Sequence, residues 1–431
     1  MLQRSQRIII IGAGVAGLTC GRVLAAYGHQ VTLFEAADGI GGRVRSDHVA
    51  GFTLDRGFQV LFDSYPAIQR LLDLPALALR RFDPGALIAL NGQRTILTDP
   101  LRDRDPAALL TAITTPIVPF ADKLRTLQLA LAMRRSSIDE ILAGPDTTTS
   151  AFLRQRGFAD TTIDTFFRPF YGGIFLDRSL ETSAKCFRFN LKMLSSGHAV
   201  LPAGGMGQIA AQLARPLLDT GCIRLHSRVV ALLYENGRVV GVRLATGEEH
   251  HADAVIIATA APDARHLVDL PLPADGLAAT TIYFSGNRPI YRARKIVLNA
   301  AADALVNSAQ LLTNVAPEYA PAGKHLLSVA ILGTPALDDA ALIRASLADL
   351  HRMFAGDRTA LAALAAYQPL AVYRIPFAQF RQPPGIHPIL PSNHTDRPGL
   401  YLAAEFTEAS SINAAMISGE ACAKLFEIDP L

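Results

Sequence analysis

The sequence contains no tryptophan, and only six of its 41 basic residues are lysine, so arginine carries most of the positive charge. These basic residues are dispersed along the chain and form no stripe interleaved with aromatic residues. The formal net charge is only +3. Because nucleic-acid-binding proteins concentrate positive charge on one face or along one helix, no nucleic acid is expected as a partner.

Cysteine is scarce as well. Cys20, Cys186, Cys222 and Cys422 lie far apart, and no C-x-x-C pair occurs. This spacing argues against a zinc site and against a disulfide framework, and it is typical of a reducing compartment. The N-terminus also lacks the apolar region of about 7–15 residues and the cleavage site of a secretory signal. We therefore expect a cytoplasmic location and no metal.

Long hydrophobic runs are absent too. No stretch approaches the roughly 18 uninterrupted apolar residues that a membrane-spanning helix needs. Yet half of the 431 residues are hydrophobic, only 18% are charged, and the mean hydropathy is +0.24. This composition excludes disordered and fibrous proteins and predicts a globular protein with a large core. It leaves open a peripheral contact with a membrane or an oily substrate.

The start of the chain predicts a βαβ unit. Residues 7–11, with the sequence RIIII, read as a fully buried strand. Residues 18–27 carry a helical apolar pattern that Gly28 ends, and residues 29–36 read as a second strand.

A glycine motif connects the first strand to the helix. Gly12 permits a tight turn, Gly14 allows a pyrophosphate to approach the backbone, and Gly17 allows the helix to pack closely on the strand. Glu35 ends the second strand, 23 positions after Gly12, where a carboxylate accepts hydrogen bonds from both ribose hydroxyls. A turn without a ligand is the alternative, but strand, helix and acid in register favour a dinucleotide-binding site, for either NAD or FAD.

The rest of the chain mixes helices and strands. We expect a helical pattern over 120–142, two short helices divided at Gly157 within 150–167, and a helix over 209–218. A hairpin turn is expected at Asn236-Gly237 and a buried strand over 254–258. The C-terminal segment reads as strand, loop and helix.

The run from GAGVAG through Glu35 to Gly41-Gly42-Arg43, followed by GFTLDRGFQVLF, resembles the amine oxidase, protoporphyrinogen oxidase and phytoene desaturase superfamily of FAD enzymes. The resemblance implies that the Gly-Gly-Arg turn crosses the pyrophosphate and that Arg43 approaches the phosphates and the flavin. A solvated loop cation is the alternative for Arg43.

Two later blocks carry the same resemblance. PGLYLAAEF is similar to the C-terminal motif of the superfamily, with Glu405 in the place of the acid that binds the ribityl and phosphate portion. The segment from Ser411 to Asn413 then opens a helix whose amides face the flavin. Val229 matches the valine whose backbone pairs with the adenine, although a plain core valine is the alternative.

The resemblance thus assigns FAD binding to residues of all three blocks. They are Gly12, Gly14, Ala16, Gly17, Glu35, Ala36, Gly42, Arg43, Gly57, Phe58, Gln59, Val229, Glu405, Ser411, Ile412 and Asn413. No cysteine lies in the stretch before the C-terminal motif, where monoamine oxidases tether their flavin. The FAD is therefore expected to be non-covalent.

The same resemblance implies an α/β fold in which a Rossmann-type FAD-binding domain is interleaved with an α+β substrate domain. The FAD-binding domain is expected to comprise residues 1–75, 200–260 and 395–431. The substrate domain is expected to comprise 76–199 and 261–394.

No catalytic residue is evident from the sequence. Tyr171, Lys295 and Tyr373 are weak candidates, and His198 is a candidate for lining a substrate channel. Apolar packing is the alternative for the two tyrosines. A solvated cationic strand is the alternative for Lys295, because Arg292 and Arg294 flank it.

These features predict an FAD-dependent oxidase, dehydrogenase or desaturase that removes hydride from a hydrophobic small molecule, such as a polyene or a porphyrinogen. No second strand–GxGxxG–helix unit for a nicotinamide cofactor occurs, so oxygen or a quinone is expected as the electron acceptor. A flavin-dependent isomerase without net redox change and an amine oxidase remain as alternatives.

Overall fold

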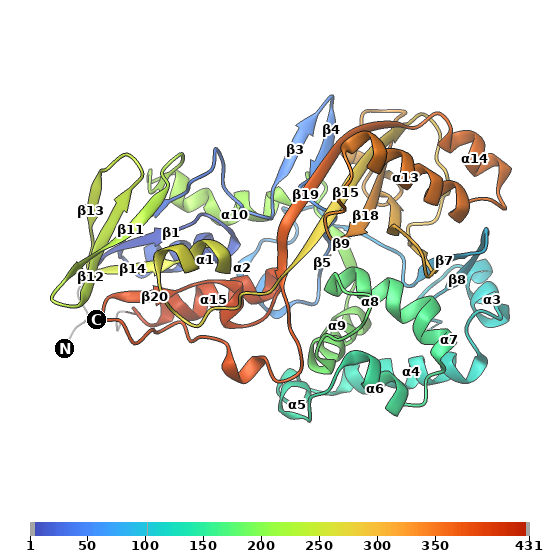
Figure 1. The fold of residues 1–431 in the computed structure, drawn as a ribbon, viewed down its shortest axis with the longest axis horizontal. Coiled ribbons are helices and arrows are strands. Elements are labelled where there is room, and N and C mark those ends of the chain that lie inside the picture. The colour runs from blue at the N-terminus through green and yellow to red at the C-terminus, as the bar shows by residue number, and fades with distance from the viewer. Residues whose placement is uncertain (1–4, 101, 428–431) are drawn as a thin grey trace.

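The computed structural model of the protein describes residues 5–100 and 102–427. Figure 1 shows a parallel sheet with its helices on one side of the molecule and a second sheet with a group of helices on the other. Residues 1–4 and 428–431, which belong to the expected FAD-binding domain, lie outside the described residues.

The first sheet is parallel, with the strand order β10–β2–β1–β14–β20. Its strands are β10 (Ile223–Arg224), β2 (Gln30–Phe34), β1 (Arg7–Ile11), β14 (Ala254–Ile257) and β20 (Leu400–Leu402). The apolar runs RIIII and AVII form its centre and are buried on both faces, as expected of parallel strands. Parallel pairing therefore joins three segments that lie far apart in the sequence.

Different layers cover the two faces of this sheet. Ile8 and Ile10 pack in one core with three helices, α1 (Val15–Ala26), α10 (Gly207–Leu218) and α15 (Ile412–Lys424). Ile9 and Ile11 point the other way, into a core shared with an antiparallel sheet of β11 (Val229–Glu235), β12 (Arg238–Leu244) and β13 (Glu249–His251). The expected βαβ unit is confirmed. So is the hairpin turn, where Asn236 and Gly237 both have positive φ.

The second sheet has seven strands in the order β19–β15–β18–β17–β16–β7–β8. They are β19 (Gln368–Phe380), β15 (Gly276–Gly286), β18 (His325–Leu332), β17 (Val306–Leu311), β16 (Ile296–Asn299), β7 (Ala86–Leu90) and β8 (Gln93–Leu97). Only β16 and β7 pair in parallel; the other neighbours are antiparallel. Helices α13 (Asp339–Met353) and α14 (Arg358–Leu364) bury their apolar faces on this sheet.

A group of helices lies beside the second sheet (Figure 1). It comprises α3 (Pro106–Thr114), α4 (Phe120–Arg135), α5 (Ile138–Ala143), α6 (Thr149–Gln155), α7 (Asp160–Thr162), a π-helical turn (Ile163–Phe167), α8 (Arg168–Phe175) and α9 (Ala184–Ser196). The helical pattern expected over 120–142 is divided between α4 and α5. The reason is a capping box, in which Ser137 and Glu140 bond each other's backbone amides and start a new helix.

Short elements connect these layers. They are β3 (Ser46–Val49), β4 (Phe52–Asp55), β5 (Leu61–Phe62), α2 (Pro66–Leu71), β6 (Arg80–Arg81), β9 (Ala199–Leu201), α11 (Ala261–Leu267), α12 (Leu312–Val315) and three 3-10 turns, Pro317–Tyr319, His387–Ile389 and Glu405–Thr407. None of the helices within 5–100 and 102–427 is both long and apolar enough to cross a membrane.

The sheets follow the expected interleaving of the chain. All strands of the parallel sheet fall within 1–75, 200–260 and 395–431, whereas the seven-stranded sheet and α3 to α9 fall within 76–199 and 261–394. The fold is thus the mixed α/β architecture that the sequence predicts, and the domain boundaries themselves stay a prediction.

Candidate functional site

One cavity of about 1780 Å³ extends from the glycine-rich turn after β1 to helices α3, α4 and α8. Pockets that hold a single small molecule measure roughly 300–1,000 Å³. The cavity therefore has room for two molecules side by side, a large one and a second one next to it.

The glycine turn forms one end of this cavity. Gly12 has a φ of +106°, and a Cβ on Gly17 would lie 2.1 Å from the Gly12 carbonyl oxygen, so both glycines serve the close packing of strand and helix. Gly14 also lines the cavity, but a Cβ there would meet no atom within 4 Å. The space next to the Gly14 Cα is therefore free of protein atoms.

Helix α1 begins at this open space. Gly14 is its N-cap, no side chain caps it, and its first turn contains no acidic residue. The amides of the first turn have no partner within the helix, and the helix dipole adds partial positive charge at this end. The arrangement suits an anion such as a pyrophosphate.

Glu35 follows β2 and also lines the cavity. Its Oε2 accepts a hydrogen bond from the amide of Ala13 and its Oε1 accepts one from the amide of Ala37, both at 2.8 Å. A carboxylate has about four acceptor positions, so each oxygen keeps the capacity to accept another bond. Glu35 is therefore fixed in orientation and ready to accept from two hydroxyl groups.

Arg43 and Glu405 form an ion pair in the wall of the cavity. Arg43 Nη2 lies 2.5 Å from Glu405 Oε2, and Arg43 Nη1 donates to the carbonyl of Ala378. Arg43 is thus no freely solvated cation. Glu405 Oε1 is buried without a partner, as is Oε1 of Gln59, whose amide nitrogen donates to the Arg43 carbonyl. Buried acceptors that lack a donor are costly, so both oxygens fit a bound donor.

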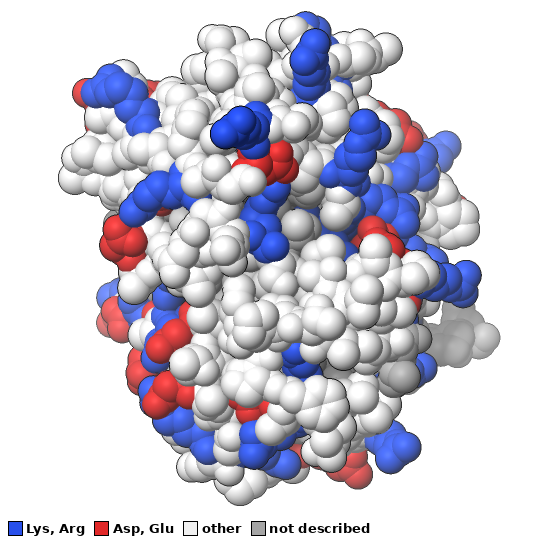
Figure 2. Space-filling model, turned by 90° about the vertical axis from the view of Figure 1, so that its right-hand side faces the viewer, with Lys and Arg blue, Asp and Glu red and all other residues white. Residues whose placement is uncertain are grey.

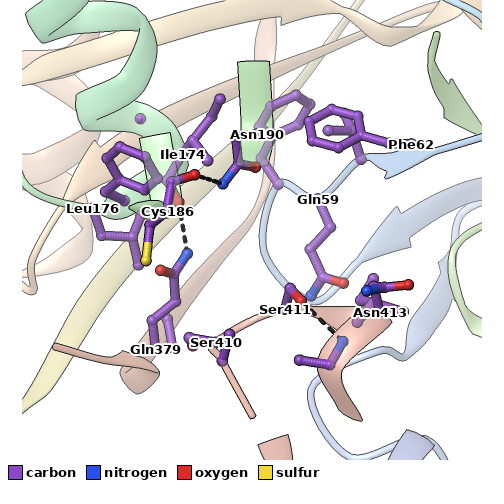
Figure 3. A pocket seen from close by; sticks show the side chains of 18 of the residues that line it. Gln59, Phe62, Ile174, Leu176, Cys186, Asn190, Gln379, Ser410, Ser411 and Asn413 are labelled. Atoms are coloured by element: carbon purple, nitrogen blue, oxygen red, sulfur yellow. Dashed lines mark hydrogen bonds between the residues drawn. The ribbon is translucent and has the colours of Figure 1, made fainter. Parts of the chain in front are cut away.

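The N-terminus of α15 forms another part of the same wall. Ser411 Oγ accepts from the amide of Ala414, and Asn413 Oδ1 accepts from the amide of Ala67. Figure 3 shows Ser411 and Asn413 close to Gln59 at one end of the pocket. The helix thus directs its partly capped N-terminus toward the cavity, where it would stabilise negative charge.

The structure brings nearly all the residues assigned to FAD binding to this one cavity. Those that line it are Gly12, Gly14, Ala16, Glu35, Ala36, Gly42, Arg43, Gly57, Phe58, Gln59, Val229, Glu405, Ser411, Ile412 and Asn413. Gly17 does not line it and serves packing instead. An open helix N-terminus, an oriented carboxylate and two buried acceptors without donors fit the phosphates, ribose and polar ring edge of a flavin dinucleotide.

Comparison with known proteins agrees with this geometry. The sequence model of the family described as "Flavin containing amine oxidoreductase" matches residues 15–425. The chain belongs to this family. FAD is accordingly the cofactor of this flavin-dependent oxidoreductase.

Relatives within the family differ in substrate. The chain is 22% identical to 15-cis-phytoene desaturase of Solanum lycopersicum over 97% of this chain and 77% of that protein. It is 27% identical to protoporphyrinogen oxidase 2 of Arabidopsis thaliana over 39% of this chain and 32% of that protein. Among solved structures, a putrescine oxidase bound to putrescine superposes with a TM-score of 0.70 at 18% identity, covering 98% of both chains. At this identity the structural likeness shows the fold alone.

The far end of the cavity is lined by apolar side chains. Phe166, Phe170 and Tyr171 come from the π-helical turn and α8, and Phe189 and Leu194 come from α9. Tyr171 packs on Phe187 at 4.6 Å between ring centroids. Burial raises the pKa of the Tyr171 phenol, so the ring stays neutral. This end suits an apolar molecule.

Two polar side chains at this end, Asn190 and Gln379, are engaged with the backbone. Asn190 donates to the Cys186 carbonyl at 2.9 Å and Gln379 donates to the Ile174 carbonyl at 2.8 Å, as Figure 3 shows. Cys186 Sγ lies 3.8 Å from His387 Nε2, and burial raises the pKa of this thiol to about 12. The thiol is therefore protonated and unreactive at neutral pH.

Two cations at this end are engaged in the same way. Lys123 Nζ donates to the carbonyls of Ile113 and Thr115 at 2.8 and 2.7 Å. The Arg102 guanidinium donates to the carbonyls of Leu194 and Gly197. Both charges thus hold the cavity wall together and are not directed at a ligand.

Two of the three catalytic candidates do not line the cavity. Lys295 is 3% exposed, and its Nζ lies 2.7 Å from Asp103 Oδ2 and 2.6 Å from the Pro84 carbonyl oxygen. The alternative interpretation of Lys295, a cation on a solvated strand, is wrong as well, because the side chain is buried. The Tyr373 hydroxyl donates to Asp47 at 2.9 Å, away from the cavity. Only Tyr171 lies where a substrate would contact it.

His198 does line the cavity, and its Nδ1 lies 3.2 Å from Asp63 Oδ2. No motif in the sequence indicates Asp103 as the partner of Lys295 or predicts the backbone contacts of Arg102 and Lys123. These pairs join distant segments with no motif or fixed spacing, so only the folded chain reveals them.

Proposed function

We propose that the chain is an FAD-dependent oxidoreductase that removes hydride from a long apolar substrate of the polyene class. The observation that carries this proposal is the wall of the far end of the cavity. Aromatic and aliphatic side chains form most of it, and the nearby cations Arg102 and Lys123 are bonded to backbone carbonyls. Such a wall recognises a hydrocarbon by burial alone.

We assign each part of FAD to the residues that line the corresponding part of the cavity. The first-turn amides of α1 would hold the pyrophosphate, and Glu35 would hold the adenosine ribose. Arg43, Gln59 and Glu405 would hold the central polar portion, beside the N-terminus of α15. Bound FAD supplies the hydride acceptor, while the protein supplies orientation and exclusion of water. We further propose that it binds without a covalent bond, because Cys186 is the sole cysteine lining the cavity in the described residues and its thiol is protonated.

Other substrate classes fit this wall less well. A porphyrinogen carries carboxylates that need cations. At this end Arg102 and Lys123 are already engaged, which leaves Lys185 among the described cavity-lining cations there. A cage of two tyrosines for an amine is not formed by Tyr171 and Tyr373, because Tyr373 donates to Asp47 instead. An isomerase acting on a polyene would use the same wall, so the fold does not separate it from a desaturase.

Product analysis tests the proposal. Holoprotein is incubated with a polyene dispersed in detergent, with a porphyrinogen and with a diamine, each in the presence of oxygen or a quinone. The expected result is loss of two hydrogens from the polyene alone. An unchanged product mass with altered double-bond geometry would support the isomerase. Turnover of the diamine or the porphyrinogen alone would contradict the proposed substrate class.

A further inference from the structure

A row of polar side chains lies on the face of the seven-stranded sheet that borders the cavity. Thr281 on β15 pairs with Ala330 on β18, and Ala330 pairs with Ser308 on β17. Paired residues of neighbouring antiparallel strands point to the same face of a sheet. All three residues line the cavity, and Thr281 and Ser308 are only 1% and 2% exposed. The row therefore belongs to the inner wall of the cavity, with a small alanine between two hydroxyl groups.

A β-bulge adds Asn307 to this row. The pairing of β17 with β18 is irregular between Val306 and Ser308, which leaves Asn307 as an extra residue opposite no residue of β18. Bulges of this kind redirect a side chain and occur often beside functional sites. Asn307 lines the cavity beside Ser308 and is 1% exposed. A Cβ on Gly173 would lie 2.8 Å from Asn307 Nδ2, so the glycine at that position makes room for the asparagine.

The amide group of Asn307 has one oxygen to spare. Its Nδ2 donates to the carbonyl of Pro169 on α8 at 3.0 Å, and because a carbonyl can only accept, this bond fixes Oδ1 on the other side of the amide. This Oδ1 is buried and has no hydrogen-bond partner among the described residues. A buried acceptor without a donor is costly, and a hydrocarbon packed beside it could not supply one. The wall is therefore suited at this place to a ligand group that donates a hydrogen bond.

The row contains no charged residue. Figure 2 shows lysine, arginine, aspartate and glutamate side chains at the surface of the molecule, where water solvates them. The row instead brings amide and hydroxyl groups to a buried wall, and such groups bind a neutral partner. A hydroxyl group can donate to Asn307 Oδ1 and accept from the Ser308 hydroxyl at once, whereas a ketone, an ether or a carboxylate can only accept.

Thr281 relates the row to the cofactor end of the cavity. Its Oγ1 accepts from the amide of Phe58 at 3.1 Å, and Phe58 is among the residues assigned to FAD. Ser308 lies two strands away on the same face, which corresponds to about 10 Å, because neighbouring strands are about 4.8 Å apart. We propose that Asn307 and Ser308 form a subsite for a hydroxyl group of the substrate, which is then an apolar chain that carries a neutral alcohol.

This inference rests on the proposed apolar substrate, and a binding experiment tests it separately from turnover. Holoprotein is titrated with geranylgeraniol, an isoprenoid polyene alcohol, and with geranylgeranyl methyl ether, which has the same chain but no donor. The change in flavin absorbance gives both Kd values. The alcohol is expected to bind about tenfold more tightly, since the ether would bury Asn307 Oδ1 without a donor. Equal Kd values would show that the row binds water only, and would overturn the subsite while the proposed function stands.

Two variants assign the preference to the row. Asn307→Leu replaces the amide with an apolar side chain of similar size, and the ratio of the two Kd values should fall to about one. Ser308→Ala removes one hydroxyl and should lower the ratio in part. Thr280→Val is the matched control and should keep the wild-type ratio. Thr280 is also buried and lines the cavity, but its hydroxyl donates to the carbonyl of Gly333.

The ratio of flavin to protein shows whether each variant folds, and Ser308→Ala decides the test if Asn307→Leu, which loses a bond to α8, does not retain flavin. A preference for the alcohol that persists in the variants of Asn307 and Ser308 would place hydroxyl recognition elsewhere and overturn the subsite. Loss of the preference in Thr280→Val as well would show a general effect of polarity and would also overturn it. A preference that depends on Asn307, without loss of two hydrogens from any polyene, would uphold the subsite and contradict the proposed function.

Discussion

The two ends of the cavity are constructed differently. The cofactor end uses backbone amides, glycine turns and the oriented carboxylates Glu35 and Glu405, from short segments near the start and end of the chain. The substrate end uses apolar side chains of α4, α8 and α9, which follow no fixed spacing. A phosphate brought against a backbone demands glycine at defined positions, whereas many side chains can form an apolar wall. Specificity for the cofactor is therefore local, and specificity for the substrate is distributed.

The largest expected effect is at Gly14. The Gly14→Val side chain would occupy the open space at the start of α1, so the purified protein should lose its FAD. The apoprotein should still fold, because a Cβ at Gly14 meets no protein atom within 4 Å and its φ is −74°. The measurement is the ratio of flavin to protein absorbance after gel filtration, with Gly14→Ala as a milder variant. A Gly14→Val protein with the wild-type ratio would contradict the proposed pyrophosphate site.

The variant Lys295→Met is expected to lower the stability of the protein strongly and to leave FAD binding unchanged. Lys295→Met leaves the carboxylate of Asp103 buried without its cation, which costs about 3–5 kcal/mol of unfolding free energy. Burial alone would raise the pKa of Asp103, but hydrogen bonds from Lys295 and Thr98 outweigh it and the pKa is lowered. Denaturant unfolding measures the loss, and the flavin ratio of the folded protein should not change.

A double variant serves as the control for this pair. Lys295→Met/Asp103→Leu removes both charges and should recover part of the lost stability. A folded Lys295→Met protein that loses its FAD would show that the lysine acts on the cofactor end after all.

A smaller effect is expected at Glu35. The two charge-assisted hydrogen bonds that it would accept from the ribose contribute roughly 1.5 kcal/mol or more each. Their loss in Glu35→Ala should weaken FAD binding by about 10²-fold. Glu35→Gln is the matched control, since its carbonyl oxygen can keep one acceptor. Binding is measured by titrating apoprotein with FAD, and an unchanged Kd in Glu35→Ala would contradict the assignment to the ribose.

The difference between the two ends of the cavity also determines which features can be predicted from the sequence. Gly12, Gly14 and Glu35 are assigned from their spacing, Glu405 is assigned from the resemblance to the superfamily, and the parallel sheet follows from buried apolar runs such as RIIII. Lys295 was misjudged because its environment depends on Asp103, 192 positions away.

The smallest expected effect concerns the junction between the two halves. Asp55 on β4 is buried there, and it accepts hydrogen bonds from Ser46, the Met206 amide and Tyr319. Burial raises the pKa of this carboxyl to about 6, an effect that those three hydrogen bonds partly offset. The folded protein therefore holds a proton at Asp55 more tightly than the unfolded chain, in which the pKa of an aspartate is about 3.9.

Asp55 is expected to contribute less to the stability of the folded protein as the pH rises. The stabilisation from protonated Asp55 is complete below the unfolded pKa and is lost as the pH rises through about 6. Between pH 7 and pH 5 the wild type should gain about 1 kcal/mol relative to Asp55→Asn. The asparagine does not titrate; its amide oxygen can accept from Ser46 and Met206, and its NH2 can donate to Tyr319. Denaturant unfolding of both proteins at several pH values measures this difference. A constant difference would show that Asp55 keeps its charge throughout this range.

A crystal structure of the purified protein, soaked with an apolar polyene, tests the central claim most directly. The account predicts FAD density from the start of α1 past Glu35 and Arg43 to the start of α15, with the polyene next to it between α4, α8 and α9. FAD density elsewhere, or a polyene bound outside this cavity, would contradict the account.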